Sequence, residues 1–323
     1  MAEDFFLGYL DQNVFSRLQD GEAAQERLLA FREASTRRNI ALVYSAIHVE
    51  ECRGSDRPEV FVNILEGLSA QFLEKPGATD TTFTLTSNRA RELILADTNF
   101  EDETTRVMNT LLSVMQFYLG WLGEVETEDL HNELIEEISR YWQRLENEFP
   151  YALPTSLLHG KNQLLESIKS LPLDSIRDDS QEMQKRFRER LPKNYAQLDD
   201  IPANEAANYL ISRIEDPVQR KINSDFPPHF WSKAEDRKEG SLAGFAFMLF
   251  ALGLIRDPRT KRKDRNHRQQ HFLGQFRDCQ HIEEASRCDA FVTFDRGAAR
   301  LAKAAYAYAG VRTQVIHLER LKI

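Results

Sequence analysis

Short apolar runs that alternate with helical segments near both ends of the chain constrain its fold most. Near the start, the apolar or β-rich runs are Phe5–Leu10, Ile40–Tyr44 and Thr81–Thr86. Near the end, Ala290–Thr293 and Thr313–Leu318 flank an alanine-rich helical segment, Ala298–Ala309. Strand–helix alternation of this kind builds a parallel sheet covered by helices. We therefore predict an α/β fold whose central parallel sheet is assembled from both ends of the chain.

The middle of the chain has a different pattern. Glu126–Phe149 places apolar residues at steps of three and four, which is typical of an amphipathic helix, and Thr104–Trp121 and Ser156–Leu171 repeat the spacing. We predict that residues 1–95 and 240–323 form the two parts of the α/β core. Residues 96–239 form a mainly helical insertion between them.

Charge and apolar content exclude several classes of protein. A net charge of −9 argues against a protein coated in nucleic acid or held on an anionic membrane. The three cysteines form no CxxC pair and no secretory leader is visible, so we expect reduced thiols and a cytoplasmic protein. The longest apolar run, Ser241–Ile255, is short for a membrane span, and we predict a buried helix there.

Four acidic residues stand where a parallel sheet presents its ligands, beyond the carboxyl ends of the strands. Asp11 ends the first strand and Asp295 follows the last but one, while Glu51 and Asp278 lie in helices beside those strands. Clustered carboxylates are the oxygen ligands of Mg²⁺ or Mn²⁺, ions that activate water for phosphodiester hydrolysis. The alternatives are ordinary ones: Asp11 and Asp295 cap turns, and Asp278 is an exposed helix acid.

The segments that carry these acids read YLDQNVF, YSAIHVEEC and DCQHIEEASRCDAFVTFD. In this order they resemble the motifs of PIN-domain ribonucleases, over roughly the first 95 and the last 60 to 80 residues. The resemblance implies a PIN-like parallel-sheet fold, metal-dependent hydrolysis of RNA more often than DNA, and Asp11, Glu51, Asp278 and Asp295 as metal ligands and catalytic residues.

The same resemblance extends to neighbouring polar residues. Asn13 completes a D-x-N pattern, and Ser45, His48 and Glu51 match a Ser-x-x-His-x-x-acid pattern, which favours Glu51 over Glu50 as the ligand. We expect Asn13, His48 and Thr293 at the substrate. A structural histidine and an ordinary strand threonine are the alternatives for the last two. Arg296 and Gly297 stand where family members often carry another acid. The number of metal ions, one or two, therefore stays open.

A basic stretch precedes the helix that bears Asp278. Arg256–His271 holds seven Lys or Arg and two Asp, a local charge of +5 in an acidic chain. Lys and Arg bind phosphates regardless of sequence, so we expect this stretch to contact the substrate backbone. A solvated loop is the alternative. The residues expected to bind are Arg259, Lys261, Arg262, Lys263 and Arg265.

Together these features predict a cytoplasmic Mg²⁺- or Mn²⁺-dependent endoribonuclease, by family analogy a toxin or defence effector. The helical insertion would select substrate, bind a protein partner or drive homo-oligomerisation. One alternative is a non-catalytic module that keeps the fold and binds protein or RNA. Another is a phosphohydrolase of small nucleotides, against which the basic stretch argues.

Overall fold

The computed structural model describes residues 5–19, 24–74, 83–95, 201–215, 241–255 and 265–319, together with single positions between 132 and 220. The chain divides into two compact units. The first comprises Met1–Asp97, Pro192–Arg262 and Gly274–Ile323, and the second comprises Thr98–Leu191 and Lys263–Leu273. The described positions of the second unit are mostly helical, and the predicted helix Thr104–Trp121 lies outside the described residues.

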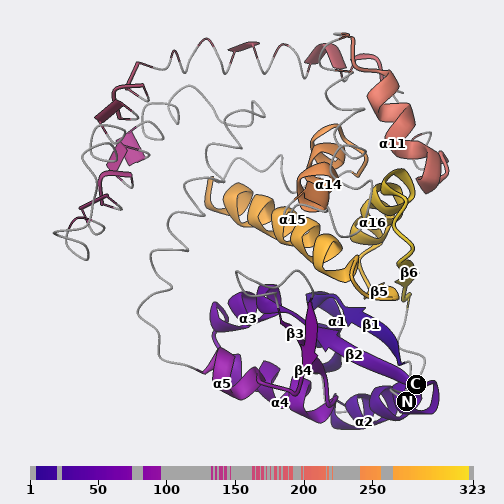
Figure 1. Ribbon diagram of the computed structural model, residues 1–323. Helices are drawn as coiled ribbons and strands as arrows, with labels where there is room; N and C mark the ends of the chain where they lie inside the picture. The colour runs from indigo at the N-terminus through magenta and orange to yellow at the C-terminus, as the bar shows by residue number, and fades with distance from the viewer. Residues whose placement is uncertain are drawn as a thin grey trace. The chain divides into compact units, whose positions relative to one another are not determined.

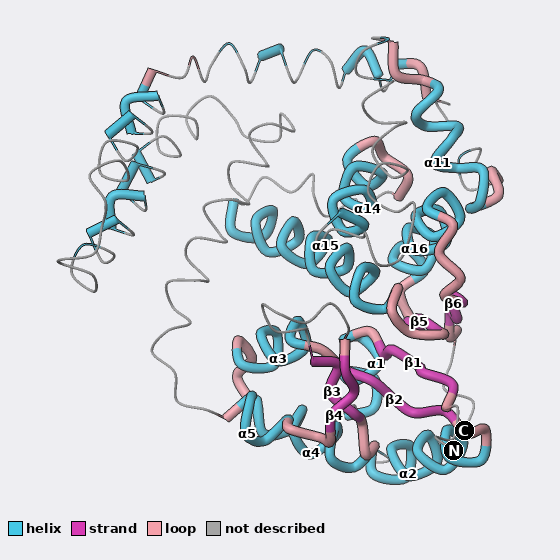
Figure 2. The backbone as a smooth tube through the Cα atoms, in the orientation of Figure 1, coloured by secondary structure: helices cyan, strands magenta, loops and turns pink. Residues whose placement is uncertain are grey.

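The first unit contains a six-stranded sheet in the order β4-β3-β2-β1-β5-β6 (Figures 1 and 2). Its strands are β1 (Phe6–Leu10), β2 (Ile40–Tyr44), β3 (Gln71–Glu74), β4 (Thr84–Thr86), β5 (Ala290–Thr293) and β6 (Gln314–His317). Neighbouring strands are parallel except β3 and β4, which are antiparallel. Since β1 lies between β2 and β5, the two ends of the chain share one sheet, as the sequence predicts.

The run Thr81–Thr86 was predicted as a strand, and its described part does form one. This is a three-residue antiparallel strand, β4, at the edge of the sheet. The strand that continues the parallel sheet after β2 is β3, which the sequence analysis did not identify. β3 is only four residues long and has a polar residue at each end, so its apolar centre is too short to stand out.

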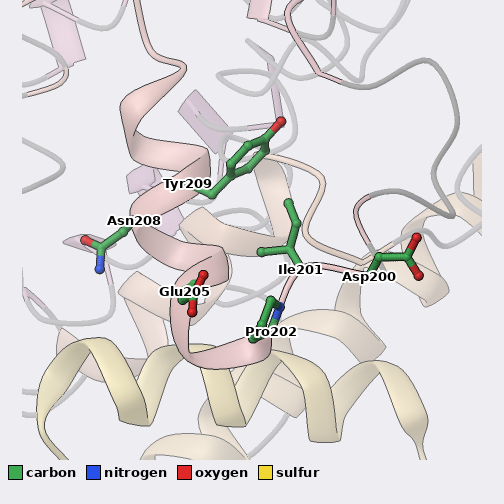
Figure 3. Close-up of a pocket in the computed structure, with 6 residues that line it drawn as sticks. All are labelled: Asp200, Ile201, Pro202, Glu205, Asn208 and Tyr209. Atoms are coloured by element: carbon green, nitrogen blue, oxygen red, sulfur yellow. The ribbon is translucent and has the colours of Figure 1, made fainter.

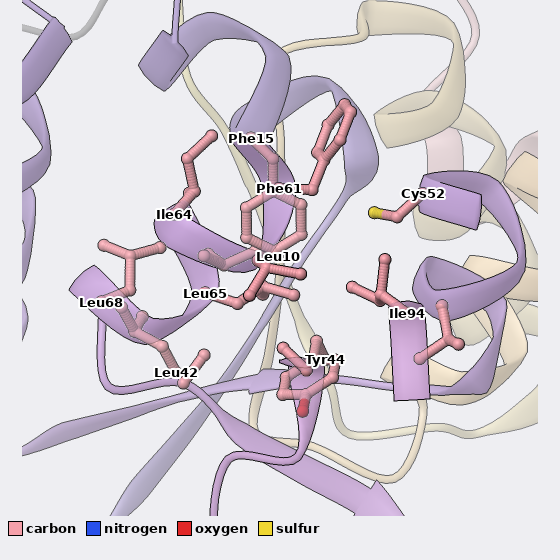
Figure 4. Packing of buried hydrophobic residues seen from close by; sticks show 14 of the residues in the cluster. Leu10, Phe15, Leu42, Tyr44, Cys52, Phe61, Ile64, Leu65, Leu68 and Ile94 are labelled. Carbon is pink, nitrogen blue, oxygen red and sulfur yellow. The ribbon is translucent and has the colours of Figure 1, made fainter. Parts of the chain in front are cut away.

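Helices cover both faces of the sheet. One face carries α1 (Gln12–Gln19), α2 (Ala24–Arg37), α3 (Ala46–Arg53), α4 (Pro58–Gly67) and α5 (Ala90–Ile94). On this face Leu10, Leu42 and Tyr44 pack with residues of these helices, including Phe15, Phe61 and Leu65 (Figure 4). Because successive strand residues point to opposite faces, Tyr9 turns the other way. Its hydroxyl meets His281 of α15 (Arg265–Ala285).

The second face also carries α16 (Arg296–Ala309), and α14 (Ser241–Ala251) packs against α16. α14 matches the predicted buried helix: Leu242, Phe245 and Leu249 are fully buried, and the buried Glu283 accepts a hydrogen bond from the Ala243 N–H near its start. α11 (Ala203–Ser212) falls within residues 96–239 and packs on α16 in the first unit. No described helix is long and apolar enough to cross a membrane.

Local sequence fixes the ends of the helices beside the site. Asp295 caps α16, because its Oδ1 accepts a hydrogen bond of 2.9 Å from the Ala298 N–H. The helix ends at Gly310, whose φ of 67° is a left-handed conformation that glycine adopts without strain. At the start of α3, the His48 ring accepts the Ser45 N–H at 3.0 Å. These contacts hold both helices at the carboxyl edge of the sheet.

Candidate active site

Asp11 lies at the carboxyl edge of the sheet and is 1% exposed. Leu10 and Val292 are paired in register, so Asp11 lies level with Thr293 on the adjacent strand β5. The Thr293 hydroxyl and the Asn13 side-chain amide both donate to Asp11 Oδ2, and the Asn13 amide also donates to Thr293 Oγ1 at 2.9 Å. These bonds fix the orientation of one buried carboxylate.

The charges of two other predicted acids reach Asp11. Burial raises the pKa of the Asp11 carboxyl, and the charges of Glu51 and Asp295 raise it further, while His281 and the hydrogen bond from Thr293 oppose the rise. Asp295 is half-buried at the start of α16. The charges of Glu51 and Asp295 thus both act on the Asp11 carboxyl, at the carboxyl edge where the sequence predicts these acids.

Glu51 is turned toward the sheet, and its side chain is 14% exposed. Its Oε2 lies 2.8 Å from His281 Nε2, and its Oε1 lies 3.9 Å from the Arg277 guanidinium. Glu50, the neighbouring residue, is exposed. The inward direction of Glu51 is the one that the sequence analysis expects.

Asp278 lies half-buried on α15, three residues before His281. Residues three apart share one side of a helix, so α15 presents Asp278 and His281 in the same direction. Burial raises the pKa of the Cys279 thiol, and the charge of the adjacent Asp278 raises it further.

A buried polar network connects Glu51 to the centre of the sheet. The Tyr9 hydroxyl lies 2.8 Å from both Ser45 Oγ and His281 Nδ1. Burial lowers the pKa of His281, but the charge of Glu51 and its hydrogen bond outweigh that effect and the pKa is raised. A protonated ring donates from Nε2 to Glu51 and from Nδ1 to Tyr9, and the Tyr9 hydroxyl then donates to Ser45.

His48 lies beside His281, with ring centroids 4.5 Å apart, and has the opposite charge preference. Burial and the charge of His281 bring the pKa of His48 well below its usual value. The neutral ring accepts the Ser45 N–H at Nδ1 and donates from Nε2 to the Leu10 carbonyl at 2.7 Å. His48 is fully buried, so the expected contact with substrate does not fit; the structural alternative does.

Thr293 is also fully buried, and its hydroxyl accepts the Asp295 N–H at 2.9 Å besides its bonds to Asp11 and Asn13. Direct contact of Thr293 with substrate therefore does not fit either. Asn13 is half-buried and its Oδ1 accepts the Phe294 N–H at 2.9 Å. Both residues orient Asp11 and join β1 to β5.

Gly297 leaves room for the Asp295 carboxylate. A Cβ at this position would lie 3.0 Å from Asp295 Oδ1. This close approach gives a physical reason for a glycine, which has no Cβ, at position 297. The resemblance leads us to expect another acid in this segment. The adjacent Arg296 is exposed and lies outside the carboxylate group.

The oxygen donors of this edge suit a hard cation such as Mg²⁺. Within the described part of the chain, however, no three His, Cys, Asp or Glu side chains are grouped so as to hold a metal ion. Mg²⁺ keeps several waters and is often bound by one or two carboxylates, so Asp11 with Glu51 or Asp295 is a sufficient donor set. The chemistry of the donors fits, whereas a preformed three-ligand site is not present among these residues.

Comparisons with protein-family models, curated proteins and solved structures found no match.

A cavity beside α11 is lined by other residues. It has a volume of about 590 Å³ and is lined by the side chains in Figure 3, among them Asp200, Glu205 and Tyr209. None of the predicted site residues is among the described residues that line it. The basic residues Arg259, Lys261, Arg262 and Lys263 lie outside the described residues, and so does the side chain of Arg265.

Tyr9 and His281 were not predicted as parts of the site, and Ser45 was named only within the Ser-x-x-His-x-x-acid pattern. Tyr9 was interpreted only as part of an apolar strand. The sequence did contain an indication of its role, because a tyrosine in a buried strand needs a hydrogen-bond partner for its hydroxyl. His281 stands three residues after Asp278, a spacing that puts both on one helix side.

Proposed function

We propose that this protein is a metal-dependent nuclease of the PIN-like class, acting on RNA in preference to DNA. The observation that carries the proposal is the buried Asp11 carboxylate, oriented by Asn13 and Thr293 at the carboxyl edge and close enough to Glu51 and Asp295 for their charges to raise its pKa. Like charges are brought together at a cost in free energy, which a bound cation offsets.

In the proposed reaction, Asp11 together with Glu51 or Asp295 would hold Mg²⁺ or Mn²⁺. Asp278 on the adjacent helix is the fourth predicted acid. The bound ion would supply an activated water and stabilise the charge that develops on the phosphodiester. Asn13 and Thr293 keep the Asp11 carboxylate in place, His281 pairs with Glu51, and Tyr9 holds His281. Hydrolysis by water attack leaves a 5′-phosphate and a 3′-hydroxyl.

The first prediction tests the acids. Asp11→Asn and Asp295→Asn each remove a charged ligand at nearly constant volume, and we expect cleavage to fall roughly 100-fold or more, because metal contributions are worth several kcal/mol. Purified wild type and variants are incubated with single-stranded RNA, duplex RNA and DNA in Mg²⁺, Mn²⁺ or EDTA. Circular dichroism serves as the control for folding. Near-wild-type cleavage by either variant in Mn²⁺ would show that the carboxylate assignment is wrong.

A non-catalytic binding module is the second candidate, and one observation favours it. Glu51 Oε2 is already paired with His281, which is the arrangement expected if Glu51 only stabilises the fold. This candidate predicts binding of RNA or protein with no cleavage in Mg²⁺, in Mn²⁺ or in EDTA. The same incubations, with binding measured in parallel, separate it from the nuclease.

A further inference from the structure

A group of positive side chains lies on α16, beside the carboxylate edge and distinct from the basic stretch. It surrounds a cavity of about 220 Å³. The described residues that line this cavity are Ala203, Arg296, Ala299, Arg300, Lys303 and His317. They include two arginines, a lysine and a histidine, and none of them is acidic. We call it the α16 cavity.

The cations of the α16 cavity are arranged by the helix. Arg296, Arg300 and Lys303 follow one another at steps of four and three residues, so they share one side of α16. The Arg300 guanidinium donates to the carbonyl oxygens of Leu198 and Ile201, which holds it in place. Arg296 and Lys303 are exposed at the cavity. A held guanidinium between two exposed cations is suited to an anion that enters from solvent.

The sheet register places this cavity beside the candidate active site. Thr293 of β5 is paired with His317 of β6, and His317 Nε2 lies 3.3 Å from the Phe294 carbonyl. Thr293 also donates to Asp11 on its other side. Asp11, Thr293 and His317 therefore follow one another along the carboxyl edge of the sheet, on three neighbouring strands. Two strand spacings amount to about 10 Å, a distance that a nucleic-acid backbone covers within a few nucleotides.

We propose that the α16 cavity binds a phosphate group of the substrate strand, close to the bond that is cut. This inference rests on the proposed nuclease function. Arginine binds phosphate through two parallel N–H bonds, and lysine adds a point charge. Of the lining residues, Arg296 is the first residue of α16, so its end of the cavity lies in the turn where the helix dipole favours an anion. Holding one phosphate here would fix how the strand crosses the carboxylate edge.

Binding without cleavage tests the proposal directly. A fluorescently labelled single-stranded RNA is titrated with protein in EDTA at several NaCl concentrations, and the dissociation constant is obtained from anisotropy. The variant Arg296→Gln/Lys303→Gln removes two charges, whereas Arg300 is left intact because it holds the segment before α11. Loss of one phosphate contact should reduce the salt slope by about 0.7 and raise the dissociation constant about fourfold at 0.15 M salt.

Two control variants accompany it. Arg37→Gln/Arg38→Gln removes the same charge from two exposed residues. They lie just before β2, at the amino ends of the parallel strands, so the salt slope should not change. Arg296→Lys/Lys303→Arg keeps both charges and should bind with the wild-type slope. Together they separate a local phosphate contact from a general change in net charge.

An unchanged slope in Arg296→Gln/Lys303→Gln overturns the proposal, as does an equal loss in the Arg37/Arg38 control or no binding by the wild type. Cleavage by the wild type together with an unchanged slope rejects the cavity and leaves the nuclease standing. A reduced slope without cleavage under any metal condition supports the cavity and rejects the nuclease. The two failures are thus distinguishable.

Discussion

Two adjacent glutamates on α3 meet different surroundings, since neighbouring helical residues point about 100° apart. Glu51 turns toward Asp11 and His281, and Glu50 is exposed. If the carboxylate edge holds a metal ion, only Glu51 is directed so as to take part.

The second prediction compares these two residues. Glu51→Gln should reduce cleavage by roughly 100-fold or more, because a metal contribution of several kcal/mol is lost. Glu50→Gln makes the same chemical change on the exposed side and should stay within a few-fold of wild type. The two rates are measured with the same RNA and Mn²⁺. Equal severe losses would mean that both carboxylates reach the metal, and equal negligible losses would reject Glu51 as a ligand.

The third prediction concerns the hydroxyl of Tyr9, which is fully buried between Ser45 and His281. Tyr9→Phe leaves two buried polar groups without that partner and should reduce the free energy of unfolding by about 1–3 kcal/mol. Urea denaturation measures the change. A double-mutant cycle with Ser45→Ala isolates the Tyr9–Ser45 bond. A loss below about 0.5 kcal/mol would show that the network contributes little to stability.

The site was only partly predictable at this scale. The positions of Asp11, Glu51 and Asp295 at the carboxyl edge could be predicted, because acids at strand and helix ends leave a visible trace in the sequence. Tyr9 and His281 are 272 residues apart, and their contact depends on how α15 packs on the sheet. Local pattern contains no information on that packing. The same holds for the burial of His48 and Thr293.

Elements were predictable where their sequence is apolar and continuous. β2 and β5 match the predicted runs residue for residue. β1 is shorter than its predicted run by one residue at the start, and β6 by one residue at each end. Such runs are typical of parallel strands buried on both faces. β3 is half apolar and short, so it was missed. Strand direction at the β4 edge depends on tertiary pairing, which no local pattern specifies.

The fourth prediction compares two glycines of the helices that carry site residues. Gly310 ends α16 with a φ of 67°, and Gly310→Ala should cost about 1–2 kcal/mol because a Cβ disfavours the left-handed conformation. Gly274 lies inside α15 with no described atom within 4 Å of an added Cβ. Gly274→Ala should therefore add about 0.5–1 kcal/mol. Chemical denaturation of both variants should give opposite signs. Equal signs would contradict the backbone conformations described.

At the scale of the whole molecule, charge is unevenly distributed: a chain of net charge −9 contains the stretch Arg256–His271 with +5. The fifth prediction changes to Glu the five residues of this stretch that we expect to contact the substrate: Arg259, Lys261, Arg262, Lys263 and Arg265. Binding of long RNA should weaken and its salt dependence flatten, because fewer counterions are released.

Cleavage of a dinucleotide-sized substrate is the control for that reversal, since so short a strand spans little of an extended basic track and should be cut at nearly the normal rate. An unchanged salt slope for long RNA would mean that the stretch is a solvated loop. Because the α16 cavity variant is measured in the same assay, the contributions of the two basic regions can be compared directly.

The central pairing of β1 with β5 has a consequence for synthesis. Gly8 pairs with Ala290, so the partner of β1 is translated roughly 15 to 60 s after it at ordinary ribosomal rates. Until then β1 has an open hydrogen-bonding edge beside Tyr9 and Leu10, and such edges promote aggregation. A nascent chain of this protein needs protection over that interval, and ribosomes stalled before β5 should release products that depend on chaperones to stay dispersed.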